Sequence, residues 1–227
     1  MNNRLKEFSK GHKSFHAIKF KTNKERFKSL VEEGQNPKAL FIGCSDSRMM
    51  PNMILNSKPG DLFIVRNIGN FVAPFKPDAD FHATASAIEY AVSVLGISDI
   101  IVCGHSHCGA IGALYKDIKT SPENIHTLKW LELGKEAKEI ALDTCKGEDK
   151  EKLLRYTEKL SVVFQLENLL TYPAVKNGVD NGSIFLHGWH YNIENGEIAY
   201  YDNENHTFKA LVENQSIKED SDDCKQY

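Results

Sequence analysis

The sequence predicts an α/β fold: a central, mostly parallel sheet flanked by helices, with an antiparallel hairpin at its edge near the C-terminus. Three short apolar runs, at residues 38–43, 61–66 and 99–104, are typical of buried strands. Between the second and third runs, residues 81–95 carry alanine and isoleucine on one helical face. Because parallel strands need a crossover connection, this strand, helix, strand order favours a parallel sheet.

The N-terminal segment, residues 1–34, is predicted to be a helical arm. It is charged, and its apolar residues recur at steps of roughly three to four positions, as in an amphipathic helix. We expect Gly11 to divide this arm into two helices. The main domain, residues 35–212, then begins just before the first strand.

The second half of the chain alternates between predicted helices and one hairpin. Residues 109–118 and 123–170 have helical patterns, with a break near Gly147, and Tyr172-Pro173 ends the last of these helices. An alternating run at 183–190, a turn at 194–196 and residues 197–201 predict the hairpin. The acidic, polar residues 213–227 are expected to form a flexible tail.

Composition narrows the class of protein. The chain has 227 residues, 41% hydrophobic and 26% charged, with a net charge of -3, so it lacks the basic field that would collect nucleic acid or anionic lipid. The polar N-terminus and the absence of long apolar runs predict a cytoplasmic protein without membrane contact. Five cysteines, an odd count, favour metal or thiol chemistry over a disulfide framework.

Two polar segments follow predicted strands and carry metal-binding side chains. Cys44-Ser-Asp-Ser-Arg48 follows the first strand, and Gly104-His-Ser-His-Cys-Gly109 follows the third. The carboxyl ends of parallel strands share one edge of the sheet, where open α/β sheets place their ligands. Cys44, His105 and Cys108 are therefore predicted to hold one zinc ion, since zinc prefers thiolate and imidazole ligands. Three ligands leave a fourth position for water, which is typical of a catalytic site.

The carboxylate of Asp46 has two possible partners at this site, the zinc ion and Arg48. Asp46 is close enough to Cys44 to take the fourth position on zinc, or it forms a bidentate pair with Arg48 and leaves that position open. Other candidates are weaker: Cys103 lies inside a strand, Cys145 and Cys224 lack metal-ligand spacing, and His107 is interpreted as a loop histidine in preference to a proton shuttle.

These motifs are similar to those of a known family. They include Cys-Ser-Asp-Ser-Arg at 44–48, Pro-Gly-Asp-Leu-Phe-Ile-Val-Arg-Asn at 59–67, Ile-Glu-Tyr-Ala-Val at 88–92 and Gly-His-Ser-His-Cys-Gly at 104–109. The chain resembles a β-class carbonic anhydrase over roughly positions 35 to 202. The resemblance implies one zinc ion per chain on the same three ligands, with Asp46 and Arg48 as a catalytic dyad.

The resemblance also implies a substrate pocket and an assembly. It assigns Gln35 a hydrogen bond to the substrate, places Phe63, Ile68 and Tyr90 around a small apolar cavity, and directs the backbone N–H of Gly109 at the bound anion. The implied reaction is reversible hydration of carbon dioxide to bicarbonate and a proton by attack of zinc hydroxide. The implied assembly is a homodimer or homotetramer in which the arm packs on a partner subunit.

Three alternatives remain open at the level of sequence. A hydrolase of carbon disulfide or carbonyl sulfide would share every ligand. A zinc-stabilised binding module without turnover would also use the three ligands, although it would not require Arg48. A redox protein based on Cys103 and Cys108 fits poorly, because their spacing is not the usual one. Phe41 stands where one bacterial subgroup has Trp, so the resemblance does not extend to that subgroup's regulatory bicarbonate site.

Overall fold

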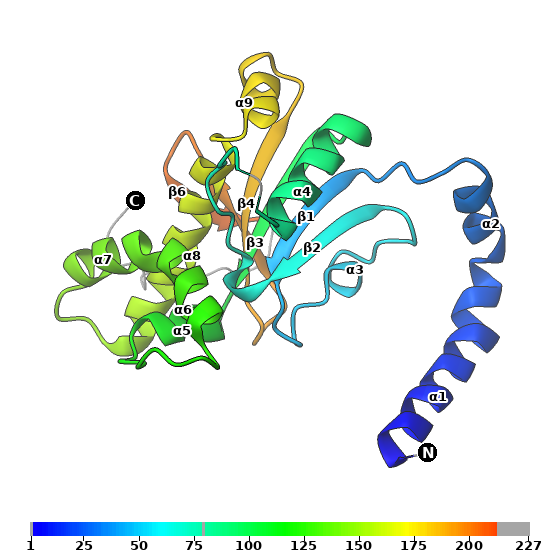
Figure 1. Ribbon diagram of the computed structural model, residues 1–227, viewed down its shortest axis with the longest axis horizontal. Helices are drawn as coiled ribbons and strands as arrows, with labels where there is room; N and C mark the ends of the chain where they lie inside the picture. Colours follow the sequence, from blue (N-terminus) through cyan, green and yellow to red (C-terminus); the bar gives the residue numbers. More distant parts are fainter. Residues whose placement is uncertain (1, 79, 213–227) are drawn as a thin grey trace.

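The protein is built around one twisted, mixed sheet, seen in a computed structural model that describes residues 2–78 and 80–212 (Figure 1). The strand order is β2-β1-β3-β4-β5-β6. The first four strands in this order pair in parallel, whereas β5 pairs antiparallel with β4 and β6 pairs antiparallel with β5. The predicted fold class is confirmed. The strands are β1 (Ala39–Cys44), β2 (Leu62–Asn67), β3 (Asp99–His105), β4 (Phe185–Tyr191), β5 (Ile198–Asp202) and β6 (Thr207–Ala210).

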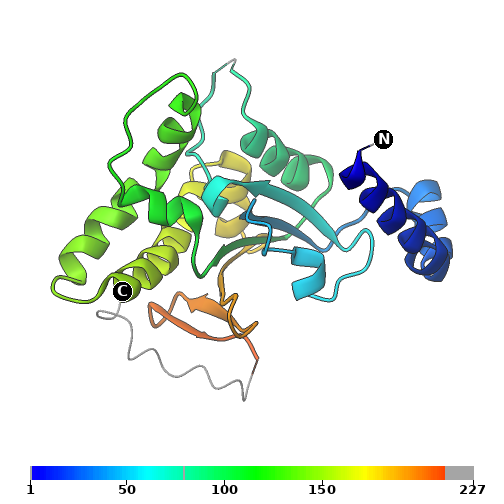
Figure 2. The ribbon, with the colours of Figure 1, turned by 90° about the horizontal axis from the view of Figure 1, so that it is seen from below.

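Helices surround this sheet and extend from it (Figure 2). They are α1 (Asn3–Phe15), α2 (Lys24–Glu32), α3 (Pro51–Ile54), α4 (Ala83–Glu89), α5 (Gly109–Leu114), α6 (Ile125–Leu131), α7 (Lys135–Thr144), α8 (Lys150–Leu169) and α9 (Pro173–Asp180). Shorter π-helical turns cover His16–Phe20 and Tyr90–Val94, and 3-10 turns cover Ile68–Asn70 and Glu132–Gly134.

The long helix α8 packs directly against the sheet. Its Val162, Leu166 and Leu169 are buried in the largest apolar cluster, with side chains from β1 and β3. Glycines make this approach possible, because a Cβ on Gly104 would lie 2.7 Å from Val162 Cγ2. The helix therefore lies immediately behind the end of β3, where the predicted metal ligands begin.

The N-terminal arm projects away from the sheet (Figure 1). Neither α1 nor α2 has a buried residue, and Phe8, Ile18 and Val31 are 71%, 63% and 84% exposed. Arg26 anchors its base by an ion pair with Asp61 at 2.7 Å. The arm thus carries apolar side chains that its own chain does not cover.

Several expectations about individual elements are wrong. Helix α1 runs through Gly11, because one exposed glycine costs a helix only about 1 kcal/mol, and the helical backbone is interrupted at Asn23 instead. Strand β6 and helix α9 were not predicted, and Pro173 begins α9 as well as ending the preceding helix.

Two further expectations concern cysteines and the tail. Cys145 is disulfide-bonded, contrary to the expectation that the cysteines favour metal or thiol chemistry over disulfides, whereas Cys44, Cys103 and Cys108 are free. The predicted flexible tail, residues 213–227, lies outside the described residues, as does Cys224. In the part of the chain that is described, no helix has the length and apolar character of a membrane span.

Candidate metal centre

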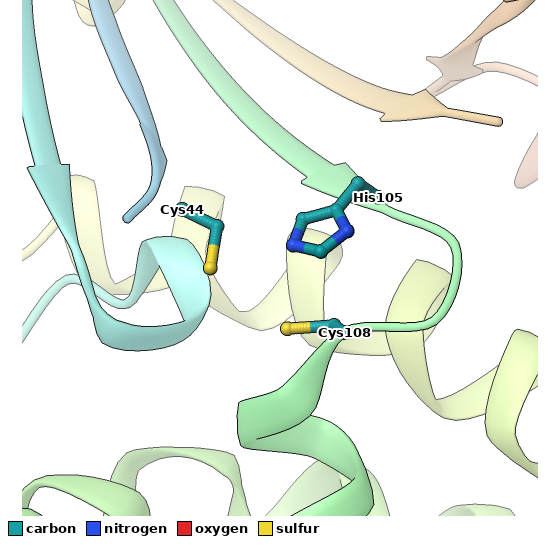
Figure 3. Close-up of side chains that lie close together, drawn as sticks. All are labelled: Cys44, His105 and Cys108. Carbon is teal, nitrogen blue, oxygen red and sulfur yellow. The ribbon is translucent and has the colours of Figure 1, made fainter. Parts of the chain in front are cut away.

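Cys44, His105 and Cys108 meet at the carboxyl edge of the sheet. Cys44 ends β1 and His105 ends β3, and these strands are adjacent and parallel, with Gly43 opposite Cys103. Cys108 follows in the loop that leads into α5. All three side chains are buried and point toward one another (Figure 3), and their ligand atoms lie within 4.8 Å of one another.

The imidazole of His105 is oriented for metal binding. Its Nδ1 lies 2.9 Å from the carbonyl oxygen of Ser106, so the Nδ1–H donates there and the lone pair is on Nε2. Nε2 is buried and has no hydrogen-bond partner among the described residues. Because a buried polar atom normally has a partner, this unmatched lone pair beside two free thiols fits a zinc ion.

The thiols of Cys44 and Cys108 shift each other's pKa in opposite directions. A hydrogen bond from the Cys108 side chain lowers the pKa of Cys44, and the same hydrogen bond raises the pKa of Cys108. Zinc binds thiolates, so metal binding has to displace the proton that the pair shares. Burial raises the pKa of Cys103, which lies in a separate apolar cluster with Phe41 and Met49 and stays a thiol.

Asp46 and Arg48 form the bidentate pair beside the metal ligands. Arg48 Nε lies 2.9 Å from Asp46 Oδ1, and Nη2 lies 2.7 Å from Oδ2. The hydrogen bonds from Arg48 hold the pKa of the Asp46 carboxyl well below its usual range. Of the two arrangements that the sequence allows for Asp46, the structure has the one in which its carboxylate is bound to Arg48.

Arginine side chains also fix the backbone of the two ligand loops. Arg66 donates from Nε to the carbonyl of Cys44 at 2.9 Å and from Nη2 to the carbonyl of Asp46 at 2.6 Å. Arg48 Nη2 reaches the carbonyl of His107 at 3.0 Å and so joins the first loop to the second. Arg66 was not singled out in the sequence, although its place as the eighth residue of the motif at 59–67 is a usable signal.

Two of the predicted substrate residues lie near the metal ligands. Gly109 is the first residue of α5, directly after Cys108. Ile68 follows β2, is 45% exposed and lines a cavity of about 1160 Å³ together with Ser45 and Asn67. The indole N–H of Trp130 donates to the carbonyl of Ile68 at 2.7 Å and holds this wall in place.

The other three predicted substrate residues lie elsewhere in the same chain. Phe63 stacks on Tyr90 with ring centroids 5.9 Å apart, but it precedes Asn67, the neighbour of Cys44, by four strand positions, about 13 Å at 3.3 Å per residue. Gln35 is exposed and precedes the start of β1, whereas Cys44 ends that strand. A single chain therefore does not bring these three residues to its own metal ligands.

The comparison with known protein families shows which family the chain belongs to. The family model described as carbonic anhydrase matches residues 39–198. The chain belongs to the β-carbonic anhydrase family. The resemblance drawn from the motifs is thus confirmed, and the protein is an enzyme of the carbonate dehydratase type.

Individual carbonic anhydrases agree with this assignment. The chain is 38% identical over 206 residues to a carbonic anhydrase of Synechocystis, covering 91% of this chain and 74% of that protein. It is 35% identical over 216 residues to one of Pseudomonas aeruginosa, covering 94% and 95%.

Solved β-carbonic anhydrases share the fold. The structure of the β-carbonic anhydrase CcaA superposes with a TM-score of 0.86 at 36% identity, covering 94% of each chain. A tetrameric β-carbonic anhydrase of Sordaria macrospora superposes with a TM-score of 0.76 at 28% identity, covering 92% of this chain and 98% of that chain.

Proposed function

We propose that the protein catalyses the reversible hydration of carbon dioxide to bicarbonate and a proton, with one zinc ion held by Cys44, His105 and Cys108. The observation that carries the proposal is the buried cluster of two free thiols and one unpartnered imidazole nitrogen, within 4.8 Å of one another. When bound at such a site, zinc supplies the Lewis acidity that makes water nucleophilic near neutral pH.

The protein's own contribution begins with Asp46. Its carboxylate is held as an anion by two hydrogen bonds from Arg48, which favours the arrangement that leaves the fourth metal position to water. In the proposed reaction a carboxylate oxygen of Asp46 accepts a hydrogen bond from the attacking water and orients it toward the substrate. Asp46 as a metal ligand belongs to a closed state, in which Arg48 has released it.

Substrate binding combines residues of two subunits in this proposal. Ile68 and the Gly109 backbone N–H lie beside the metal ligands of their own chain, whereas Gln35, Phe63 and Tyr90 are contributed to a neighbouring subunit. The edge position of β2 and the exposure of Gln35 and of Tyr90, which is 44% exposed, support this sharing. An apolar pocket with one amide suits a small, uncharged substrate.

The proposed assembly is a homodimer or homotetramer. The uncovered apolar side chains of the arm support contact with a second copy, because large apolar surfaces are rarely left in water. The related Sordaria enzyme is tetrameric. The cytoplasmic location stays a prediction.

Stopped-flow hydration of carbon dioxide by the zinc-loaded protein tests the proposed function, with sulfide release from carbon disulfide measured in parallel. We expect hydration in the wild type, and in Asp46→Asn a large loss of rate with zinc retained. A zinc-loaded wild type that releases sulfide but does not hydrate carbon dioxide would assign the site to the hydrolase alternative. A protein that does neither would support the binding module.

A further inference from the structure

A carboxylate that the reaction itself does not use lies directly behind the metal ligands. Glu158, on α8, is buried, and its Oε1 accepts the backbone N–H of Cys108 at 3.0 Å. The same oxygen accepts from Arg155 Nη2 at 2.9 Å, and Oε2 lies 3.3 Å from His190 Nε2. One carboxylate thus gathers donors from its own helix, from β4 and from the ligand loop.

We propose that Glu158 is a positioning residue, which fixes the backbone at Cys108 so that its Sγ meets Cys44 and His105 in the geometry of a zinc site. This inference rests on the proposed zinc site and names a residue that holds it together. Because Cys108 precedes a helix of only six residues, α5, the loop has little rigidity of its own.

The position of Glu158 suits this role because its helix also supports the other ligand-bearing strand. A Cβ on Gly104 would lie 3.5 Å from the carbonyl oxygen of Glu158, so α8 touches the residue just before His105. The turn of α8 at Glu158 therefore contacts β3 through its backbone and the Cys108 loop through its side chain. A shift of either contact would change the distance between two metal ligands.

The surroundings of Glu158 hold its carboxylate in place. Arg155 supplies the compensating charge that a buried carboxylate requires. Burial lowers the pKa of His190, so this ring is neutral and its Nε2–H donates to Glu158. Because both oxygens accept hydrogen bonds, the carboxylate is held in one orientation. In that orientation Oε1 accepts the backbone N–H of Cys108.

Stability alone is the competing explanation, and the same helix offers a matched control. Gln165 is also buried in α8, and its Oε1 accepts a backbone N–H from outside the helix, that of Val72, at 2.8 Å. Gln165→Ala removes a comparable buried acceptor from a segment that carries no metal ligand. It is therefore expected to lower stability without changing the metal site.

The experiment compares full-length wild type, Glu158→Ala, Glu158→Gln, Glu158→Asp and Gln165→Ala. Zinc affinity is measured by competition with a chromophoric chelator, and the site is probed by the thiolate-to-metal absorption of the cobalt(II)-substituted protein. Second-sphere partners of metal ligands typically contribute 10- to 100-fold in metal affinity. We expect Glu158→Ala to lose that factor and to alter the cobalt spectrum, and Gln165→Ala to retain both affinity and spectrum.

The two conservative variants, Glu158→Gln and Glu158→Asp, distinguish the effect of side-chain length on zinc affinity from the effect of charge. Gln keeps one oxygen at the same reach for the Cys108 N–H, although it gives up the charge beside Arg155 and turns an NH2 toward His190, so Glu158→Gln should bind zinc more tightly than Glu158→Asp. Asp keeps the charge but shortens the side chain by one methylene, so Glu158→Asp should lose about tenfold or more. This pair decides the question even if Glu158→Ala does not fold.

Three results would overturn the inference. The first is wild-type zinc affinity and a wild-type cobalt spectrum in Glu158→Ala or Glu158→Asp. The second is weaker zinc binding by Glu158→Gln than by Glu158→Asp, and the third is a loss of zinc affinity in Gln165→Ala equal to that in Glu158→Ala. Failure of the proposed zinc site itself looks different, because the wild-type protein would then bind neither metal at the three ligands.

Discussion

Arg48 holds both carboxylate oxygens of Asp46, with Nε 2.9 Å from Oδ1 and Nη2 2.7 Å from Oδ2. The same Nη2 reaches the carbonyl of His107 at 3.0 Å, across 59 residues of sequence. One guanidinium therefore orients the acidic side chain of the first ligand loop and ties that loop to the second. This relationship gives the metal centre a feature that a purely structural zinc site does not need.

Removing the guanidinium should reduce catalysis while leaving the metal in place. In Arg48→Ala, Asp46 loses both of its hydrogen bonds from the Arg48 side chain. Its carboxylate is then free to take the fourth position on the zinc ion. Because loss of one oriented charge at an active site typically costs about 100-fold or more, we expect carbon dioxide hydration to fall by at least tenfold. Zinc content, measured by elemental analysis, should stay at one per chain.

The control for this prediction is an exposed ion pair on α9, a helix that carries none of the three proposed metal ligands. Lys176 pairs with Asp180 at 3.0 Å, with both side chains more than half exposed. Lys176→Ala should hydrate carbon dioxide at the wild-type rate. Equal activity of Arg48→Ala and wild type would contradict the role given to the pair.

Two buried cysteines five residues apart should behave differently on substitution. Cys103 stays a thiol in an apolar cluster, whereas Cys108 belongs to the metal cluster. We expect Cys103→Ser to keep zinc and to hydrate carbon dioxide within about threefold of wild type, although a buried hydroxyl lowers stability by about 1–3 kcal/mol. Cys108→Ser should lose zinc. Loss of zinc from Cys103→Ser in a folded protein would disprove this distinction.

The contact between α8 and the end of β3 can be tested at Gly104. A Cβ there would lie 2.7 Å from Val162 Cγ2, so Gly104→Ala should lower the free energy of unfolding by about 1–3 kcal/mol through overpacking. Urea denaturation measures this change. Gly112→Ala is the matched control, since a Cβ at that position meets nothing within 4 Å and helical alanine is favoured over glycine. Its stability should equal or exceed that of wild type.

The buried His190 should make stability depend on pH. Burial lowers its pKa below the usual 6.5, so as pH falls from about 6.5 toward the folded pKa the unfolded chain takes up a proton that the folded chain does not. This group then lowers the free energy of unfolding by up to about 1.4 kcal/mol per pH unit. Stability that depends on neutral His190 is present above pH 6.5 and is lost on acidification.

His190→Gln keeps a side-chain donor for Glu158 and removes the titrating ring. Comparison of urea denaturation between pH 5 and pH 8 should therefore show a shallower pH dependence in the variant. Parallel curves for the two proteins would show that His190 does not contribute.

The cluster of Cys44, His105 and Cys108 could be predicted from sequence because Cys44 and His105 each end a short apolar run and Cys108 follows three residues after His105. A strand that ends in Cys44 and another that ends in His105 meet at one sheet edge once they are parallel neighbours. The pairing of Asp46 with Arg48 was inferred from alternating positions in an extended segment. In the structure it forms in a turn, which the Met49 N–H closes by donating to the Asp46 carbonyl oxygen at 2.9 Å. Both inferences depended on local spacing and a simple rule of topology.

Features that depend on distant packing were harder to predict. Gly11 signals a helix break, but its cost is too small to interrupt α1, and β6 is only four residues long. Glu158 was missed because helices often carry acidic residues on their exposed face. A usable signal existed, because Glu158 lies four residues before Val162 and eight before Leu166, on the face of α8 that packs on the sheet.

A catalytic zinc ion held by Cys44, His105 and Cys108 can be tested by metal removal and restoration. Metal is removed from the purified protein with a chelator, carbon dioxide hydration is measured, and the measurement is repeated after addition of one equivalent of zinc. We predict loss of hydration on removal and recovery on addition in the wild type, with no recovery in Cys108→Ser. Undiminished hydration by the metal-free protein, or full recovery in Cys108→Ser, would show that catalysis does not depend on a zinc ion held by these three residues.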